Sequence, residues 1–400
     1  MKKILNTAFF NRVLLICTYF VILPGYVIQG YFNTDIRIIY LLVAVINLAF
    51  IISNGKLNIQ GNIAKFIFFV FAMGFLGSII SMKTSQILMA TCLSTSLIIM
   101  SSEWLNFTNK QSVKIISFII SAMIIGAIGG FIYAYTGGES ISKVILQGGN
   151  EVFSYGTTYT NSVSGNLIRP SAFFDEPGAL AFMIILVVCI NEALRGNSFK
   201  SFLLLLGGLI TGSLFLFIIL LVFLLYKTNL KFVFTPNFYL FILLLLLFHL
   251  FFNNAYQIAD TFFFQRLGNL GLSYNGNLGD SRTMEIYNFL HSVNWDITLY
   301  GVENKTSGGQ SANPFAIYYG YGIFIWIPYL FIELWLIYAS LFYRSNLRLP
   351  AIILFLALLQ RPYIFNLYWQ MLIVLTLVII YKLEKQPILF ISGEPDAKNN

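Results

Sequence analysis

The sequence predicts an all-helical membrane protein that crosses the bilayer many times. Hydrophobic residues make up 58% of its 400 residues, charged residues only 10%, and the mean hydropathy is +0.78. A water-soluble domain of this length could not carry that composition without large exposed apolar patches. Apolar runs long enough to cross a bilayer recur along the chain. We therefore treat 1–400 as one membrane-embedded domain.

The basic start of the chain runs into a long apolar segment, which indicates an uncleaved first span. Clear spans are expected near residues 9–30, 36–53, 63–81, 86–101, 113–135, 177–194, 236–252, 315–341 and 363–381. Two further stretches are ambiguous in length. The run 200–226 is long for one span and contains the break Thr211-Gly212-Ser213, whereas the run 349–362 is short and ends at Arg361-Pro362.

The distribution of lysine and arginine resolves both stretches, because these residues favour the cytoplasmic side. If 200–226 formed one span, Lys227 and Lys231 would face outward, and splitting it near Gly212 returns both to the cytoplasm. Counting 349–362 as a span also places Arg344, Arg348, Lys382 and Lys385 inside. The sequence therefore predicts about twelve transmembrane helices with both termini cytoplasmic. The net charge of +8 then suits an anionic leaflet, and nucleic acid is not implied as a partner.

Two long polar segments, 136–172 and 253–314, then lie outside the membrane. Both are rich in Gly, Asn, Ser, Thr and Tyr. This composition suits loops that contact sugars, and it equally suits ordinary solvated turns. The end of the chain, 391–400, is typical of a short disordered cytoplasmic tail. The three cysteines lie in apolar runs, so neither a disulfide framework nor a metal or cofactor site is implied.

An arginine and two acids stand just before the span 177–194. Charge at a bilayer boundary tends to occur where a charged substrate is held. Asp175 and Glu176 are candidate catalytic acids, although either could simply cap the helix that starts at Pro177. Capping does not explain Arg169, which the positive helix end would repel. Its guanidinium suits a bidentate grip on a phosphate, and a salt bridge to one of the acids is the alternative.

A second group of polar residues lies in the segment 253–314. From Ser281 onward, apolar residues recur at near-helical spacing, which predicts an amphipathic helix on the outer leaflet. Arg282 is a candidate diphosphate ligand, or else the intrahelical partner of Glu285. His291 is a candidate general base because the ordinary histidine pKa is near neutrality, whereas a lone histidine is more often a surface residue.

A third arginine, Arg361, lies at the outer end of the span 349–362. It either snorkels to the interface or lines a cavity shared with Arg169 and Arg282. Three arginines on one face, each next to a proline or a loop, suit a lipid diphosphate.

The decapeptide RPSAFFDEPG at 169–178 resembles the R-P-S-x-F-x-E-P motif of O-antigen polymerases of the Wzy type. It stands in the same place, between a long outer loop and the following span. Arg282, Gly301 and the stretch Asn313-Pro314 before Gly320-Tyr321-Gly322 are similar to the family's second large periplasmic loop and its return into the membrane. The resemblance covers the whole topology, but its sharp part is this decapeptide.

The resemblance implies a GT-C-like membrane glycosyltransferase of the bacterial inner membrane, acting at the periplasmic face. Its substrate would be undecaprenyl-diphosphate-linked oligosaccharide, with the growing glycan transferred to the terminal hydroxyl of one new lipid-linked repeat. Membrane lipids, a chain-length regulator and a flippase are the partners it implies. We assign Arg169, Arg282 and Arg361 to the diphosphates. Glu176 is assigned to the acceptor hydroxyl as base or orienting acid, and Asp175 is the second candidate for that role.

Two alternatives remain open from the sequence. An O-antigen ligase would share the topology, but ligases related to this family carry a His-Asn pair in the second loop, where this chain has Ala312-Asn313. A lipid-linked oligosaccharide flippase or other transporter would be expected to show paired repeats and shorter outer loops.

Overall fold

The computed structural model describes the chain over residues 36–53, 59–82, 84–108, 110–145, 151–194, 197–227, 295–301 and 315–385. The described part contains four helices long and apolar enough to cross a membrane, Gly61–Ser81, Thr84–Ser102, Lys114–Tyr135 and Ile323–Phe342. Shorter apolar helices stand beside them. The architecture is that of a helical membrane protein. The spans expected at 9–30 and 236–252 lie outside the described residues.

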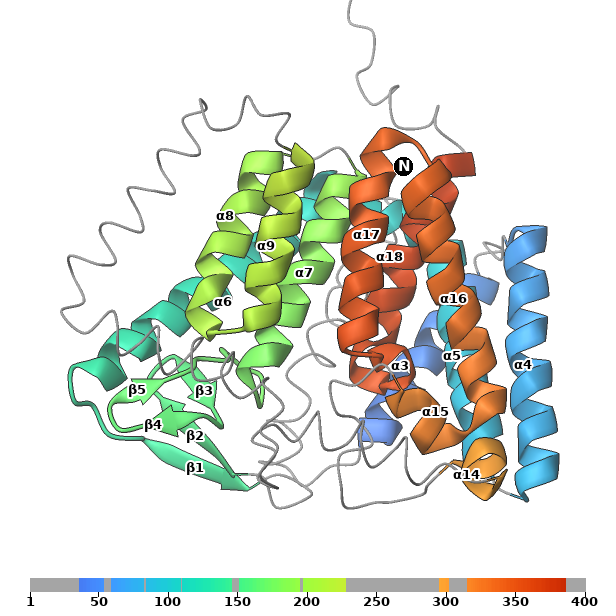
Figure 1. The fold of residues 1–400 in the computed structure, drawn as a ribbon, viewed down its shortest axis with the longest axis horizontal. Helices are drawn as coiled ribbons and strands as arrows, with labels where there is room; N and C mark the ends of the chain where they lie inside the picture. The colour runs from blue at the N-terminus through green and yellow to red at the C-terminus, as the bar shows by residue number, and fades with distance from the viewer. Residues whose placement is uncertain are drawn as a thin grey trace, which may run out of the picture.

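The helices form two groups that stand side by side (Figure 1). One group holds α6 Lys110–Tyr135, α7 Pro177–Ala193, α8 Ser198–Gly208 and α9 Leu214–Lys227. The other group holds α3 Ile36–Ser53, α4 Gly61–Ser81, α5 Thr84–Thr108, α16 Ile323–Phe342, α17 Ser345–Gln360 and α18 Leu367–Lys385.

The core lies where α7 meets α17 and α18. Every residue of α7 from Ala179 to Ala193 is buried, as is α18 from Trp369 to Ile380. Both stretches are mostly apolar and expose no polar face, and such helices belong at the centre of a bundle. In contrast, α4 buries few side chains and leaves most of its apolar surface exposed, as a lipid-facing helix does.

The predicted break in the run 200–226 is confirmed. Helix α8 continues into a short 3₁₀ turn, η1 Leu209–Thr211, and ends at Gly212, whose φ of +58° favours glycine. Helix α9 then starts at Leu214 and packs beside α8 (Figure 1).

The span expected near 315–341 is present, but it starts later, at Ile323. The structure divides the expected range into α15 Ala316–Tyr321 and α16, with Gly322 between them at a φ of +76°. A Cβ at Gly322 would lie 2.5 Å from the Leu299 carbonyl oxygen, so the chain can only turn here with glycine. Leu299 belongs to the short helix α14 Trp295–Tyr300, which begins at the last apolar residue of the amphipathic helix expected from Ser281 onward. The residues from 281 to 294 lie outside the described part.

The first long polar segment, 136–172, contains strands where the composition suggested irregular loops. The strands are β1 Ser142–Ile145, β2 Glu151–Tyr155, β3 Thr158–Thr160, β4 Val163–Ser164 and β5 Leu167–Ile168. The first three form an antiparallel sheet in the order β1-β2-β3, and β4 pairs with β5. The β-branched and aromatic residues of β2 and β3 favour strands, and Gly156, with φ of +61°, makes the turn between them.

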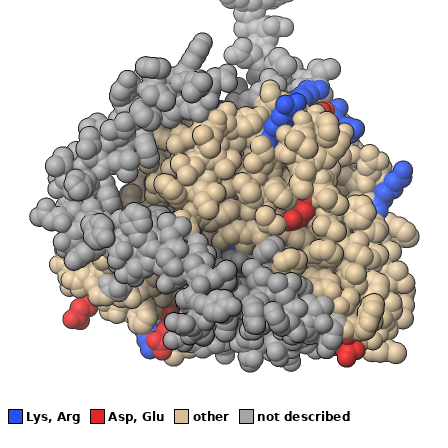
Figure 2. Space-filling model, in the orientation of Figure 1, with Lys and Arg blue, Asp and Glu red and all other residues tan. Residues whose placement is uncertain are grey.

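Basic residues gather at the end of the bundle away from these strands, as Figure 2 shows at its upper edge. Here α17 begins next to Arg344 and α18 ends, and the Arg344 guanidinium lies 3.8 Å from the Glu384 carboxylate. Lys227 at the end of α9 pairs with buried Glu192 at 2.7 Å. Lys382 and Lys385 occupy the last turn of α18. These are the residues that the positive-inside rule assigns to the cytoplasmic side.

Candidate active site

The candidate site lies where the segment 169–176 enters α7, next to the small sheets. Strand β3 holds this segment: Ser171 N–H donates to the Tyr159 carbonyl at 2.8 Å, and Tyr159 N–H donates to the Ala172 carbonyl at 2.7 Å. The Thr158 hydroxyl accepts from Ala172 N–H at 2.9 Å. Ala172 has φ of +51°, an uncommon conformation for a residue with a Cβ, and one that tends to occur at functional sites.

Arg169 is buried, with 8% of its surface exposed. Its Nε donates to the Thr211 carbonyl and its Nη2 to the Gly212 carbonyl, both at 3.1 Å. These carbonyls belong to the end of η1, where a helix leaves its last acceptors without intrahelical partners. Arg169 therefore clamps the turn between α8 and α9, an arrangement the sequence did not predict for it.

Glu176 occupies the N-cap position of α7, and Pro177 is the first helical residue, as expected. However, its side chain makes no capping hydrogen bond. Its carboxylate instead accepts from Arg361 Nη1 and lies 3.4 Å from the Tyr363 hydroxyl. The capping account of Glu176 therefore fails for its side chain, and the partner is the arginine from the end of α17.

Arg361 is only 4% exposed and lies between α17 and the 3₁₀ turn η4 Tyr363–Phe365. It donates to the Tyr363 hydroxyl as well as to Glu176, and its guanidinium carbon lies 5.3 Å from the centre of the Tyr363 ring. Gly178 makes room for it, because a Cβ there would lie 2.0 Å from Arg361 Nη2. The Arg361 side chain therefore does not extend to the surface. It is enclosed between the start of α7 and the end of α17.

Asp175 is half-buried beside this ion pair. Burial, and then the neighbouring negative charge of Glu176, raise its pKa to about 7. A carboxyl with this pKa exchanges a proton near neutral pH. Such a group can accept a proton from a hydroxyl, whereas an ordinary aspartate is too weak a base.

An aromatic cluster backs the ion pair. The Phe174 ring stacks on Trp369 at 5.5 Å between centroids, and the edge of Phe182 meets both Trp369 at 5.2 Å and Tyr363 at 5.4 Å. Next to Phe174, Phe173 leaves 49% of its surface exposed. The carboxylates thus have an apolar wall behind them and an exposed ring nearby, a combination that suits a substrate with polar hydroxyls and apolar sugar faces.

Several residues of this site were not found from the sequence. Tyr363, Gly178 and Trp369 are missing from the sequence-based set, although Tyr363 directly follows the Arg361-Pro362 pair that drew attention to the region. Gln370 is a further one: its amide donates to the Ile364 carbonyl at 2.9 Å, and its carbonyl oxygen accepts from Ser96 at 3.1 Å. This buried bridge fixes the turn that carries Arg361 and Tyr363.

The structure brings Asp175, Glu176 and Arg361 together and gives Arg169 separate partners. Arg282 and His291, the two candidates from the polar segment 253–314, lie outside the described residues. No cluster of three or more His, Cys, Asp or Glu residues that could hold a metal ion occurs among the described residues.

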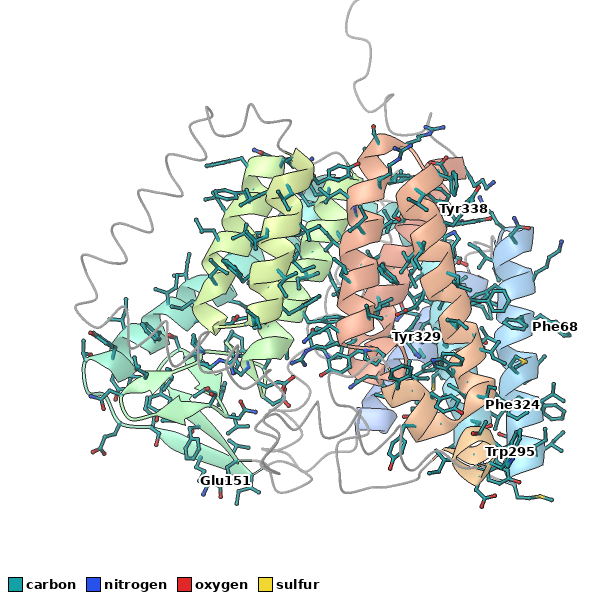
Figure 3. All side chains as sticks on the ribbon, in the orientation of Figure 1. Phe68, Glu151, Trp295, Phe324, Tyr329 and Tyr338 are labelled. Atoms are coloured by element: carbon teal, nitrogen blue, oxygen red, sulfur yellow. The ribbon has the colours of Figure 1, made fainter. Side chains whose placement is uncertain are left out.

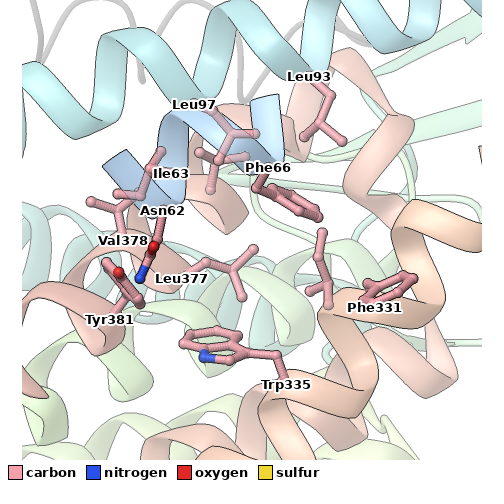
Figure 4. Close-up of a pocket in the computed structure, with 12 residues that line it drawn as sticks. Asn62, Ile63, Phe66, Leu93, Leu97, Phe331, Trp335, Leu377, Val378 and Tyr381 are labelled. Atoms are coloured by element: carbon pink, nitrogen blue, oxygen red, sulfur yellow. The ribbon is translucent and has the colours of Figure 1, made fainter. Parts of the chain in front are cut away.

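A cavity of about 240 Å³ lies between α4, α5, α16 and α18 (Figure 4). Apart from Asn62 and Tyr381 it is lined by apolar side chains, including Phe66, Leu97 and Trp335. Such a lining suits hydrocarbon, and it offers few partners to a sugar or a phosphate. On α18 the cavity uses residues 374–381, beyond Trp369, so it is separate from the ion pair.

No family model, curated protein or solved structure matches this chain.

Proposed function

We propose that this protein polymerises a bacterial surface polysaccharide such as O-antigen at the periplasmic face of the inner membrane. In this reaction, a glycan linked to undecaprenyl diphosphate is transferred from its lipid to the terminal hydroxyl of one new lipid-linked repeat. The bond from the anomeric carbon to the diphosphate breaks, a glycosidic bond forms, and the acceptor hydroxyl loses its proton.

One observation carries the proposal. Glu176, in the segment that resembles the polymerase motif, meets Arg361 and Tyr363 from near the other end of the chain, at the end of the bundle where the strands lie. If the Glu176–Arg361 ion pair had only a structural role, it would not explain the acid next to it. Asp175 has a pKa of about 7, which fits a proton acceptor. An acid with a raised pKa at the end of a membrane bundle favours chemistry on a substrate held at the interface.

In this proposal, each residue of the candidate site has a separate role. Asp175 accepts the proton of the acceptor hydroxyl. Glu176, with 32% of its side chain exposed, orients that hydroxyl, and Arg361 holds the Glu176 carboxylate in place. Arg169 and Arg361 are buried, so they do not contact the leaving diphosphate directly. Their positive charges stabilise it through space, in surroundings of low dielectric constant. Arg282 is the candidate for direct contact with the diphosphate.

Deleting the gene in its own host tests the proposal. A polymerase deletion removes the ladder of long glycan chains but leaves single repeats attached to the final lipid anchor. Loss of all attached glycan would instead indicate a ligase, and failure of lipid-linked repeats to reach the periplasm would indicate a flippase. Complementation with the wild-type gene should restore the ladder, and a variant with Glu176→Gln should not.

A further inference from the structure

The end of helix α17 has a hydrogen-bonding problem that its own backbone cannot solve. Arg361 N–H donates to the Ala357 carbonyl at 2.8 Å and so closes the last regular turn. The next carbonyl, that of Leu358, would accept from residue 362. That residue is Pro362, which has no N–H, so the Leu358 carbonyl needs a donor from elsewhere.

Tyr329 of α16 supplies that donor. Its hydroxyl donates to the Leu358 carbonyl at 2.8 Å, and its ring is buried between the two helices. Figure 3 labels Tyr329 on the side of α16 that faces α17. The helix that carries Arg361 at its end is thus held by a tyrosine from the neighbouring helix.

Glu333, one helical turn beyond Tyr329, is hydrogen-bonded to the same hydroxyl and is 8% exposed. A tyrosine hydroxyl has one hydrogen, and here the Leu358 carbonyl takes it. The contact with Glu333 is then satisfied only if Glu333 donates. An ionised Glu333 would compete for the hydrogen and leave the Leu358 carbonyl without a partner. Among the ion pairs of the described residues, none involves Glu333, and a buried charge without one is costly.

We propose that Glu333 is a permanently protonated acid that donates to Tyr329, and that this pair positions the end of α17 and hence Arg361. Glu333 and Tyr329 are positioning residues that lie behind the site and act through the Leu358 carbonyl. The inference rests on the proposed function only for its activity measurement, because the protonation state of Glu333 can be measured by itself.

Infrared difference spectroscopy of the purified protein tests the protonation. At alkaline pH, where Asp175 is ionised, we expect a carbonyl band of a protonated carboxylic acid that disappears in Glu333→Gln. In Tyr329→Phe the band should persist but shift, because the acid loses its acceptor. Absence of such a band from the wild-type protein would overturn the proposal.

Polymerisation activity tests the positioning. Glutamine is neutral and can donate to Tyr329, so Glu333→Gln should retain activity within about twofold, whereas Glu333→Ala and Tyr329→Phe should each lose roughly tenfold. Equal loss in Glu333→Gln and Glu333→Ala would contradict a neutral donor. If the wild-type protein itself forms no polymer, the proposed function fails, and the infrared result still decides the state of Glu333.

Discussion

At the scale of residues, two adjacent acids have different surroundings. Glu176 forms an ion pair with Arg361. Burial and the negative charge of Glu176 raise the pKa of Asp175 to about 7. Asp175 can accept a proton only when ionised, so turnover should rise as the pH increases through about 7 and then level off. In Asp175→Asn the remaining activity should be low and should lack this rise. A wild-type profile that is flat between pH 6 and 8, measured with donor and acceptor saturating, would exclude Asp175 as the base.

Gly178 tests the enclosure of Arg361. Alanine there would place a Cβ 2.0 Å from Arg361 Nη2, so the guanidinium must move and its bond to Glu176 must weaken. We therefore expect Gly178→Ala to lower activity about tenfold or more. Protein levels should stay normal, because alanine favours the helix more than glycine does. Gly61→Ala is the matched control, since nothing lies within 4 Å of a Cβ at that position. Normal activity in both variants would show that the position of Arg361 is not critical.

At the scale of elements, Arg169 connects the motif segment to the turn between α8 and α9. Arg169→Ala leaves the Thr211 and Gly212 carbonyls without their buried donor and should lower the free energy of unfolding by about 2–4 kcal/mol. Arg169→Lys should recover part of this loss, because one ammonium cannot follow the guanidinium fork. Thermal unfolding in detergent measures both, with exposed Arg344→Ala as control. A lysine variant as stable as wild type yet inactive would favour phosphate binding instead.

The elements show how far sequence reasoning reached. Gly212 could be recognised as a helix break because it stands between two apolar runs, and rare charges in apolar surroundings pointed to Asp175, Glu176 and Arg361. The pairing of Glu176 with Arg361 could not be predicted, because 185 residues separate them. The strands β2 and β3 were missed since their composition is also that of loops. The role of Arg169 depends on carbonyls that only the folded turn exposes.

At the scale of the whole molecule, the strands lie at one end of the bundle and the turn between α7 and α8 at the other (Figure 1). If the basic end is cytoplasmic, a reporter fused at the Gly156 turn should show alkaline phosphatase activity, and one fused at Asn197 should not. The reverse pattern would place the candidate site inside the cell and exclude a periplasmic reaction. Equal activity at both positions would mean that residues 156 and 197 lie on the same side.

If Asp175 and Glu176 carry the proposed reaction, the purified protein alone should elongate lipid-linked repeats. The most direct test incubates the purified protein in detergent with lipid-linked repeat extracted from the deletion strain. The length of the glycan products is then measured. We predict that wild-type protein converts the repeat into a ladder of longer chains, and that Glu176→Gln, with the same fold and a neutral side chain, is slower by on the order of a hundredfold. No elongation by the wild-type protein, or near-normal turnover by Glu176→Gln, would contradict the account.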